Sequence, residues 1–288
     1  MGRLGKFVFS FVLFIIVCYG GLVWFANHEV EKGFNAAVDS TEGLDVTYAD
    51  LWFDLFDRTV TLTDVKATLA SGKQYTADEV IVYAFDERHS IPHFIRAQAN
   101  GLTVTPSVLG LPVTPEMKEL TGDLTLDYRY DSATKSLNLA TLAFDEARLG
   151  KVEVSGTMTQ LDLDQFRVEN LVGLRIKDAE FRLRNRQLMD TLFENGAAAL
   201  GATPEVAQQQ LIAELDMLAE QAGKANKPIP EKAFLELKRF VEQPEMLIVR
   251  AAPQEPVPYL YFFMGRDLYE NLHLLNLSVE SRIVEKNQ

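Results

Sequence analysis

Apolar residues follow three different spacings along the chain, and each spacing predicts a different kind of element. They are continuous from Phe7 to Ala26, alternate with polar residues from Leu44 onward, and recur every three or four residues after Asn185. A long continuous run predicts a membrane-spanning helix, alternation predicts strands with one buried face, and the wider spacing predicts amphipathic helices. We therefore predict an α+β fold, in which an N-terminal transmembrane helix precedes an antiparallel β-sheet domain covered in part by C-terminal amphipathic helices.

The flanks of the run from Phe7 to Ala26 predict its orientation. Arg3 and Lys6 precede the run, whereas acidic residues dominate the segment from Asn27 to Asp45. Basic flanks stay in the cytoplasm, so we predict a single-pass membrane protein with a cytoplasmic N-terminus and a periplasmic or other extracytoplasmic C-terminal domain. The alternative is a cleaved secretory signal, with Cys18 and Gly20 as the small residues at a cleavage site. Both interpretations place the domain outside the cytoplasm.

Alternation of apolar and polar residues predicts a meander of antiparallel strands. In the segment from Val60 to Leu69 the pattern changes register at Asp64, which predicts a bulge, and Ser71-Gly72 predicts the following turn. The other segments with this pattern are Leu44–Leu51, Tyr75–Ala84, Gly101–Thr105, Leu124–Tyr130, Leu137–Leu139, Val152–Met158 and Phe181–Leu183. The segment from Leu161 to Val172 is ambiguous. Such strands would form a sheet with one apolar face.

The first part of the chain resembles AsmA-like proteins, which are anchored in the bacterial inner membrane. The resemblance covers Met1 to Thr105. It rests on a strand from Leu44, the sequence VTLTDVKATL from Val60, the Ser71-Gly72 turn and the sequence ADEVIV from Ala77. It implies that the β-sheet is curved, that its concave side can hold acyl chains, and that the protein serves envelope lipid homeostasis. The chain is shorter than the long members of that family, and its last third is helical.

Helical periodicity dominates that last third. A short helix near Leu188 to Phe193 is followed by one that starts at Thr203-Pro204 and ends near Gly223, and a third extends from Pro230 to Pro244. A strand near Met246, a short helix from Leu268 to Leu275 and a terminal strand from Leu277 complete the chain, and that strand could close the sheet. The predicted domains are residues 1–28 (stub and anchor), 29–43 (juxtamembrane helix and linker), 44–184 (sheet) and 185–288 (helices and terminal strands).

Charge and cysteine content narrow the classes of partner. The formal net charge is -13, which argues against nucleic acid as a partner. Cys18 is the only cysteine, so neither an intramolecular disulfide nor a thiolate metal cluster can form. The partners that we predict are the lipid bilayer, through Phe7 to Ala26, and an acyl lipid or another envelope protein.

Motifs for catalysis or cofactor binding are absent from the sequence, so we predict no enzymatic activity, no cofactor and no metal. His89 and His93 have the spacing of helical zinc ligands, but Pro92 disfavours that helix, and an exposed polar loop is the preferred interpretation. Asp162 and Asp164 could hold a divalent ion, although their alternation with leucines favours a strand with one solvated face. His273 fits a half-buried histidine in a leucine-rich helix.

Aromatic residues supply the candidate ligand site. The candidate apolar patch consists of Trp52, Phe53, Phe56, Tyr259, Tyr261, Phe262 and Phe263. These side chains could line a concavity for an acyl chain, or they could be ordinary core between sheet and helices. Three functions stay open: a lipid-binding or envelope-homeostasis module, a tethered structural or interaction scaffold, and an extracytoplasmic hydrolase using Asp162 and Asp164.

Overall fold

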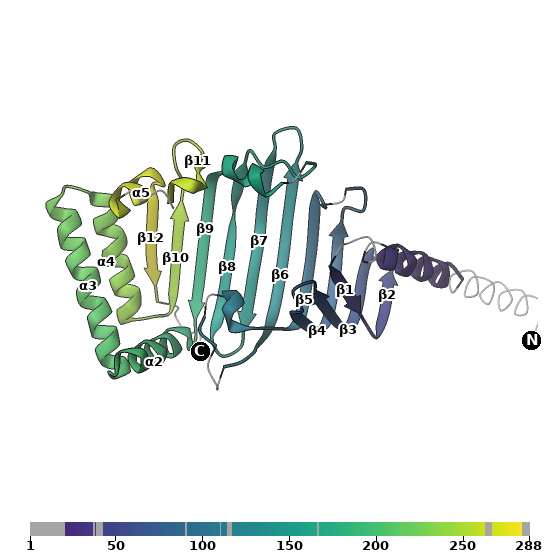
Figure 1. Ribbon diagram of the computed structural model, residues 1–288, viewed down its shortest axis with the longest axis horizontal. Helices are drawn as coiled ribbons and strands as arrows, with labels where there is room; N and C mark the ends of the chain where they lie inside the picture. Colours follow the sequence, from purple (N-terminus) through teal and green to yellow (C-terminus); the bar gives the residue numbers. More distant parts are fainter. Residues whose placement is uncertain are drawn as a thin grey trace, which may run out of the picture. The chain divides into compact units, whose positions relative to one another are not determined.

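The computed structural model describes residues 21–36, 38, 43–89, 91–109, 111–113, 117–165, 167–262 and 267–283. The fold is a large antiparallel β-sheet of 12 strands with helices (Figure 1). The chain divides into two compact units. Unit 1 comprises the residues up to Ala84 together with Ala97–Val104, and unit 2 comprises Phe85–Arg96 and the residues from Thr105 onward.

The predicted fold class, which begins with a transmembrane helix, is wrong. Among the residues that the structure describes, no helix is long and apolar enough to cross a membrane. The helix at residues 21–36 contains Glu29, Glu31 and Lys32, so only its first turns are apolar. Residues 7–20 of the predicted anchor lie outside the described residues.

Unit 1 is a small sheet with the helix at residues 21–36 beside it. Its strands are β1 (Leu44–Thr47), β2 (Asp50–Asp54), β3 (Thr59–Leu69) and most of β4 (Gln74–Phe85) and β5 (Phe94–Val104). Strands β1 and β2 both pair with β3, which pairs with β4. The backbone N–H of Phe53 donates to the Asn27 side chain, and the Tyr48 hydroxyl donates to Asn35 at 2.9 Å. These bonds attach the helix to the sheet.

The predicted bulge at Asp64 is not an inserted residue. Thr63 pairs with Glu79 and Val65 pairs with Ala77, so the register of β3 against β4 is the same on both sides of Asp64. Asp64 instead adopts a φ of 49°, in the left-handed region. This local twist of the backbone accounts for the change in the apolar pattern.

Unit 2 contains a longer sheet with helices at its C-terminal end. The strand order is β6-β7-β8-β9-β10-β12, and β11 pairs with β9. The strands are β6 (Leu120–Asp131), β7 (Ser136–Glu146), β8 (Gly150–Thr159), β9 (Arg175–Asn185), β10 (Met246–Ala251), β11 (Val257–Pro258) and β12 (Leu277–Arg282). The helices are η1 (Pro106–Leu109), η2 (Val168–Gly173), α2 (Leu188–Leu200), α3 (Pro204–Lys224), α4 (Pro228–Glu242), η3 (Tyr259–Phe262) and α5 (Leu268–Leu274). The predicted terminal strand is β12.

The register of unit 2 arranges apolar side chains in four rows across one face of the sheet. Row 1 is Leu124, Phe144, Val152, Leu183 and Leu247. Row 2 is Leu126, Leu142, Val154, Phe181 and Val249. Row 3 is Tyr128, Leu139, Gly156, Ala179 and Ala251. Row 4 is Tyr130, Leu137, Met158 and Ile176. Side chains alternate between the two faces of a strand, and residues that pair across neighbouring strands point to the same face. Each row therefore continues from one strand to the next.

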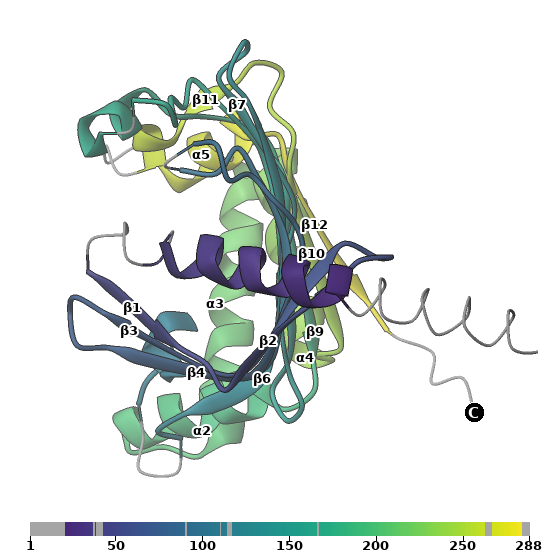
Figure 2. The ribbon, with the colours of Figure 1, turned by 90° about the vertical axis from the view of Figure 1, so that its right-hand side faces the viewer.

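Helices cover one end of this face. Figure 1 shows α3 beside α4, with β12, β10 and β9 following in that order. In Figure 2 the sheet is seen nearly edge on, and α2 and α5 lie on the same side of it. The core of this end consists of Leu183, Met189, Leu215, Ala219, Ala233, Phe234, Phe240, Val241, Leu247 and Val279. The alternating strands and the amphipathic helices therefore share a single core here.

The opposite face of the same strands carries a ladder of ion pairs. Arg250 bonds Glu180 on β9 and Glu280 on β12, and Arg182 bonds Glu180 and approaches Glu153 on β8. Charged side chains of opposite sign thus alternate across four strands. This face is the solvated face of the sheet.

Candidate functional site

The predicted aromatic patch is divided between the two units. Trp52, Phe53 and Phe56 lie on β2 and the turn after it in unit 1, whereas Tyr259 and Tyr261 lie in η3 of unit 2. The side chain of Phe262 and all of Phe263 lie outside the described residues. Trp52 is 53% exposed and Phe56 is 81% exposed, so neither is a core residue. Both are exposed aromatic side chains of unit 1.

Rows 2 and 3 form the larger apolar surface, which sequence analysis did not locate. Every residue of these two rows is at least partly exposed, and Leu142 is 39% exposed, while Phe181 and Val249 at the far end of row 2 pack against the helix-covered core. In row 1, by contrast, Phe144, Leu183 and Leu247 are buried. We call rows 2 and 3 the open rows. Their residues are apolar throughout, apart from the hydroxyl of Tyr128, which donates to the Pro92 carbonyl at 2.8 Å.

Row 3 is built from small side chains where it crosses β8, β9 and β10. Gly156 pairs with Ala179, which pairs with Ala251, between the larger side chains of rows 2 and 4. A Cβ atom on Gly156 would lie 2.5 Å from the Asp178 carbonyl oxygen and 2.9 Å from the Ala179 Cα atom. Close backbone approach therefore requires glycine at this position.

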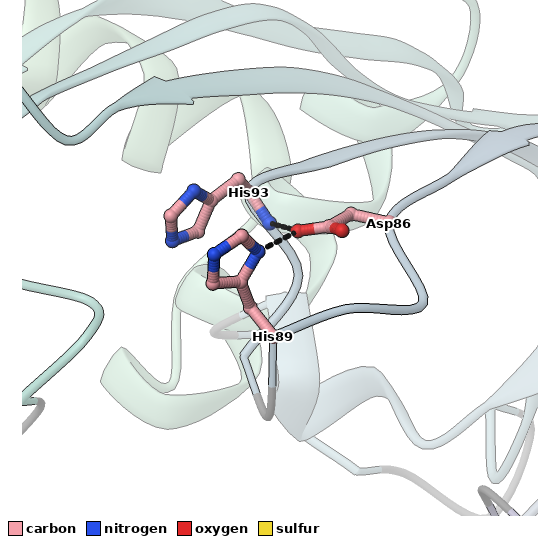
Figure 3. A group of neighbouring side chains, drawn as sticks. All are labelled: Asp86, His89 and His93. Atoms are coloured by element: carbon pink, nitrogen blue, oxygen red, sulfur yellow. Dashed lines mark hydrogen bonds and ion pairs between the residues drawn. The ribbon is translucent and has the colours of Figure 1, made fainter.

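A second cluster lies in the loop between β4 and β5, within unit 2. Figure 3 shows Asp86, His89 and His93, with one carboxylate oxygen of Asp86 shared by two partners. Asp86 Oδ2 lies 2.6 Å from His89 Nδ1 and accepts the His93 backbone N–H at 2.9 Å. The two imidazole rings stack with centroids 3.6 Å apart, and the edge of Tyr130 meets the His93 ring.

The loop holds the Asp86 carboxylate in its charged form. Asp86 is only 5% exposed. Burial alone would raise the pKa of Asp86, but the N–H groups of His93 and Arg88 and the His89 side chain outweigh it and lower the pKa to about 2. Asp86 therefore caps the loop as a carboxylate at neutral pH.

The predicted acidic pair does not act as a unit. Asp162 Oδ2 accepts from Lys135 Nζ at 2.6 Å, whereas Asp164 Oδ1 lies 2.8 Å from His93 Nε2. The predicted strand here is wrong, because residues 161–165 form a loop in which Leu161 and Leu163 are buried with Tyr130. Leu161 and Leu163 point into the protein and hold the loop against Tyr130, whereas Asp162 and Asp164 point outward. This arrangement explains why leucine and aspartate alternate along the loop. His273, predicted to be half-buried, is exposed on α5.

The sequence pattern indicated the spacing of His89 and His93 and singled out Asp164 together with Asp162, but it gave no sign of Asp86 or of the contact between Asp164 and His93. Asp86 directly follows strand β4, and its spacing of three residues from His89 was the only local signal. Asp164 is 71 residues from His93 and is brought to it by the pairing of β6, β7 and β8. A side-chain contact that depends on long-range strand pairing in this way has no signature in a single sequence.

A protein-family model described as "Uncharacterized protein" matches residues 136–282, just over half of the chain. The chain belongs to this family. The matched region contains β7 to β12 and helices α2 to α5, and thus most of the open rows. Asp86, His89 and His93 lie before it. No curated protein matches the chain.

Proposed function

We propose that this protein is a lipid-binding module that holds an acyl chain against the open rows of unit 2. The observation that carries the proposal is the apolar surface of rows 2 and 3, which stays partly exposed on β6 to β8 and meets the helix-covered core at Phe181 and Val249. Contiguous exposed apolar surface in a folded protein marks a binding site for a ligand or partner. An acyl chain suits this surface because it requires apolar walls and no particular hydrogen bonds.

The dimensions of the open rows suit such a chain. Five strands from β6 to β10 span four interstrand spacings, roughly 19 Å in all. The small side chains of Gly156, Ala179 and Ala251 lie between larger neighbours, so a chain lying over row 3 would contact rows 2 and 4 as well. Each methylene group removed from water would contribute about 0.8 kcal/mol before the costs of binding.

The exposed aromatic residues of unit 1 support a place beside a lipid surface. Trp24 and Phe25 are exposed on the helix at residues 21–36, and Trp52 and Phe56 are exposed on and after β2. Tryptophan is favoured at membrane interfaces because its ring is apolar and its N–H is polar. The extracytoplasmic location and the envelope role that the AsmA-like resemblance implies stay predictions, as does the absence of enzymatic activity.

Filling row 3 tests the lipid proposal without adding charge. Ala179→Leu should place a larger side chain where the acyl chain would lie, and it should lower the affinity for a fluorescent fatty acyl probe at least tenfold. The matched control is Thr157→Leu, which adds similar bulk on the opposite face of β8 and should leave probe binding unchanged. Far-UV circular dichroism and thermal unfolding would establish that both variants are folded.

Three results would contradict the proposal. The wild-type protein could bind no probe, it could carry no lipid by native mass spectrometry after purification without detergent, or both leucine variants could bind like wild type. The alternative function, a non-enzymatic interaction scaffold, would then explain the open rows as a docking face for a protein segment.

A further inference from the structure

We infer that Asp86, His89 and His93 form a binding site for a divalent transition metal ion of the Zn²⁺ class. One ligand atom from each of the three side chains lies within 4.8 Å of the other two. Two imidazole nitrogens and a carboxylate oxygen are the donors that zinc prefers, and three protein ligands leave a fourth position for water.

The loop already fixes two of the three ligands in place. The carboxylate of Asp86 accepts the backbone N–H groups of Arg88 and His93, so it is held where the chain turns. The backbone of His93 is fixed by the Tyr130 N–H, which donates to the His93 carbonyl at 2.6 Å, and its ring contacts the Tyr130 ring. Rigid ligands lower the entropic cost of binding an ion.

His89 is the ligand that must move. A tetrahedral ion with bonds of about 2.1 Å separates its ligand atoms by roughly 3.4 Å, whereas His89 Nδ1 is 2.6 Å from Asp86 Oδ2. The two rings are also parallel within 10°, so their in-plane lone pairs do not converge on one point until a ring turns. The His89 side chain is 43% exposed, which leaves it room to rotate about its side-chain bonds and shift by about 1 Å.

Asp164 acts as a positioning residue. Its Oδ1 atom lies 2.8 Å from His93 Nε2, which leaves Nδ1 of His93 for the metal. Histidine ligands commonly donate their second N–H to a carboxylate, which fixes the tautomer and the ring orientation. The His93 side chain is 14% exposed, so its orientation depends on this partner.

Metal binding would hold the two ends of the β4–β5 loop together. The loop is attached to β6 through the His93 carbonyl and through the Tyr128 hydroxyl, which donates to the Pro92 carbonyl. An ion shared by Asp86, His89 and His93 would join both ends of the loop, and a ligand that binds only the folded state stabilises it.

Metal titration of the full chain tests this inference. Untagged protein, treated with chelator and dialysed, should bind one Zn²⁺ per chain in isothermal titration calorimetry, and its unfolding temperature should rise with Zn²⁺. His89→Ala and His93→Ala should each abolish this binding. Asp164→Asn should weaken it by about 10- to 100-fold, the usual effect of losing a carboxylate that orients a ligand. His273→Ala is the matched control, since His273 is an exposed histidine of unit 2 outside the cluster, and binding should be unchanged.

Co²⁺ provides a readout that loss of structure would not imitate. The Co²⁺-loaded protein should show two hyperfine-shifted imidazole N–H signals in its proton NMR spectrum, and His89→Ala, which no longer holds the ion, should show neither of them while its circular dichroism spectrum stays that of wild type. The inference is overturned if wild-type protein binds no stoichiometric ion, or if His89→Ala and His93→Ala bind as tightly as wild type.

Discussion

The apolar face of the unit 2 sheet has two regions that are alike in sequence and different in environment. Toward β12, α4 and α5 pack against the sheet while α2 and α3 extend the same core, and Leu183, Leu247 and Val279 are buried in it. Toward β6 and β8, rows 2 and 3 present the same kinds of side chain, yet Leu142 is 39% exposed. The comparison shows that alternation specifies which face of a strand is apolar and does not specify what covers it.

The covering helices explain the difference. Helix α4 lies along β12, and α3 packs on α4, so the helical layer extends away from the open rows. Where helices cover only part of the width of a sheet face, the rest of that apolar face is left without a covering layer. The open rows are this uncovered part, and they are the surface on which we propose that an acyl chain binds.

The largest expected difference between the two regions is in stability. Phe234→Ala removes a side chain that is 5% exposed at the centre of the helix-covered core, and it should lower the free energy of unfolding by about 3 to 5 kcal/mol. Leu126→Ala in row 2 should cost roughly 1 kcal/mol, because a half-buried leucine gives up only part of its transfer free energy. Urea unfolding followed by far-UV circular dichroism measures both values.

If Phe234→Ala and Leu126→Ala lowered the free energy of unfolding equally, the two regions would not differ, because row 2 would be as well covered as the core. A loss near zero for Phe234→Ala would show instead that α4 is not part of a cooperative core.

Much of this architecture could be predicted from the sequence, because local periodicity determines it. The predicted helix from Thr203-Pro204 to Gly223 matches α3, and the predicted helix from Leu268 to Leu275 matches α5 within one residue. Long-range pairing could not be predicted, so the rows and the length of β5 were missed. The transmembrane helix in the predicted fold class was wrong, since the helix that the structure describes at residues 21–36 continues through Glu29, Glu31 and Lys32 and is not apolar over the length of a membrane span.

The candidate sites show the same limit. The aromatic residues were found from composition, but their division between units depends on the tertiary fold. For His89 and His93, Pro92 correctly indicated that no helix forms. Because helical spacing was the reason to consider a metal site there, we discounted the pair. The structure brings His89 and His93 together in a loop around a capping carboxylate, which helical spacing does not describe.

An intermediate effect is expected from the ion pairs on the solvated face behind the covered core. Burial alone would raise the pKa of Glu180, but hydrogen bonds from Arg250 and Arg182 outweigh it and hold the pKa below its usual value of 4.5. A lowered folded-state pKa contributes stability that is fully present above the unfolded pKa and is lost as the pH falls through the folded value. The urea midpoint should therefore fall as the pH is lowered from about 5 to about 3.

Glu180→Gln tests whether this residue causes part of that pH dependence. The variant should be less stable than wild type at pH 7 and should show a shallower fall below pH 5, and amide exchange of β10 and β12 should be faster. A variant with the same stability and the same pH profile as wild type would show that the ladder contributes nothing to holding β10 and β12 on β9.

The smallest expected effect tests which face of α3 belongs to the covered region. Leu215 and Asp216 are neighbours, but Leu215 is a buried member of the core and Asp216 is exposed and bonded to Lys238 Nζ at 2.8 Å. Leu215→Ala should cost about 2 to 5 kcal/mol. Asp216→Ala should cost less than about 1 kcal/mol, because an exposed ion pair gains little from its Coulomb attraction after side-chain ordering and salt screening. The difference in stability between Asp216→Ala and wild type should disappear in high salt. The urea midpoints of both proteins with and without added NaCl measure it. If Asp216→Ala destabilised the protein as much as Leu215→Ala does, α3 would pack into the core through another face, and the boundary between the covered core and the open rows would have to be redrawn.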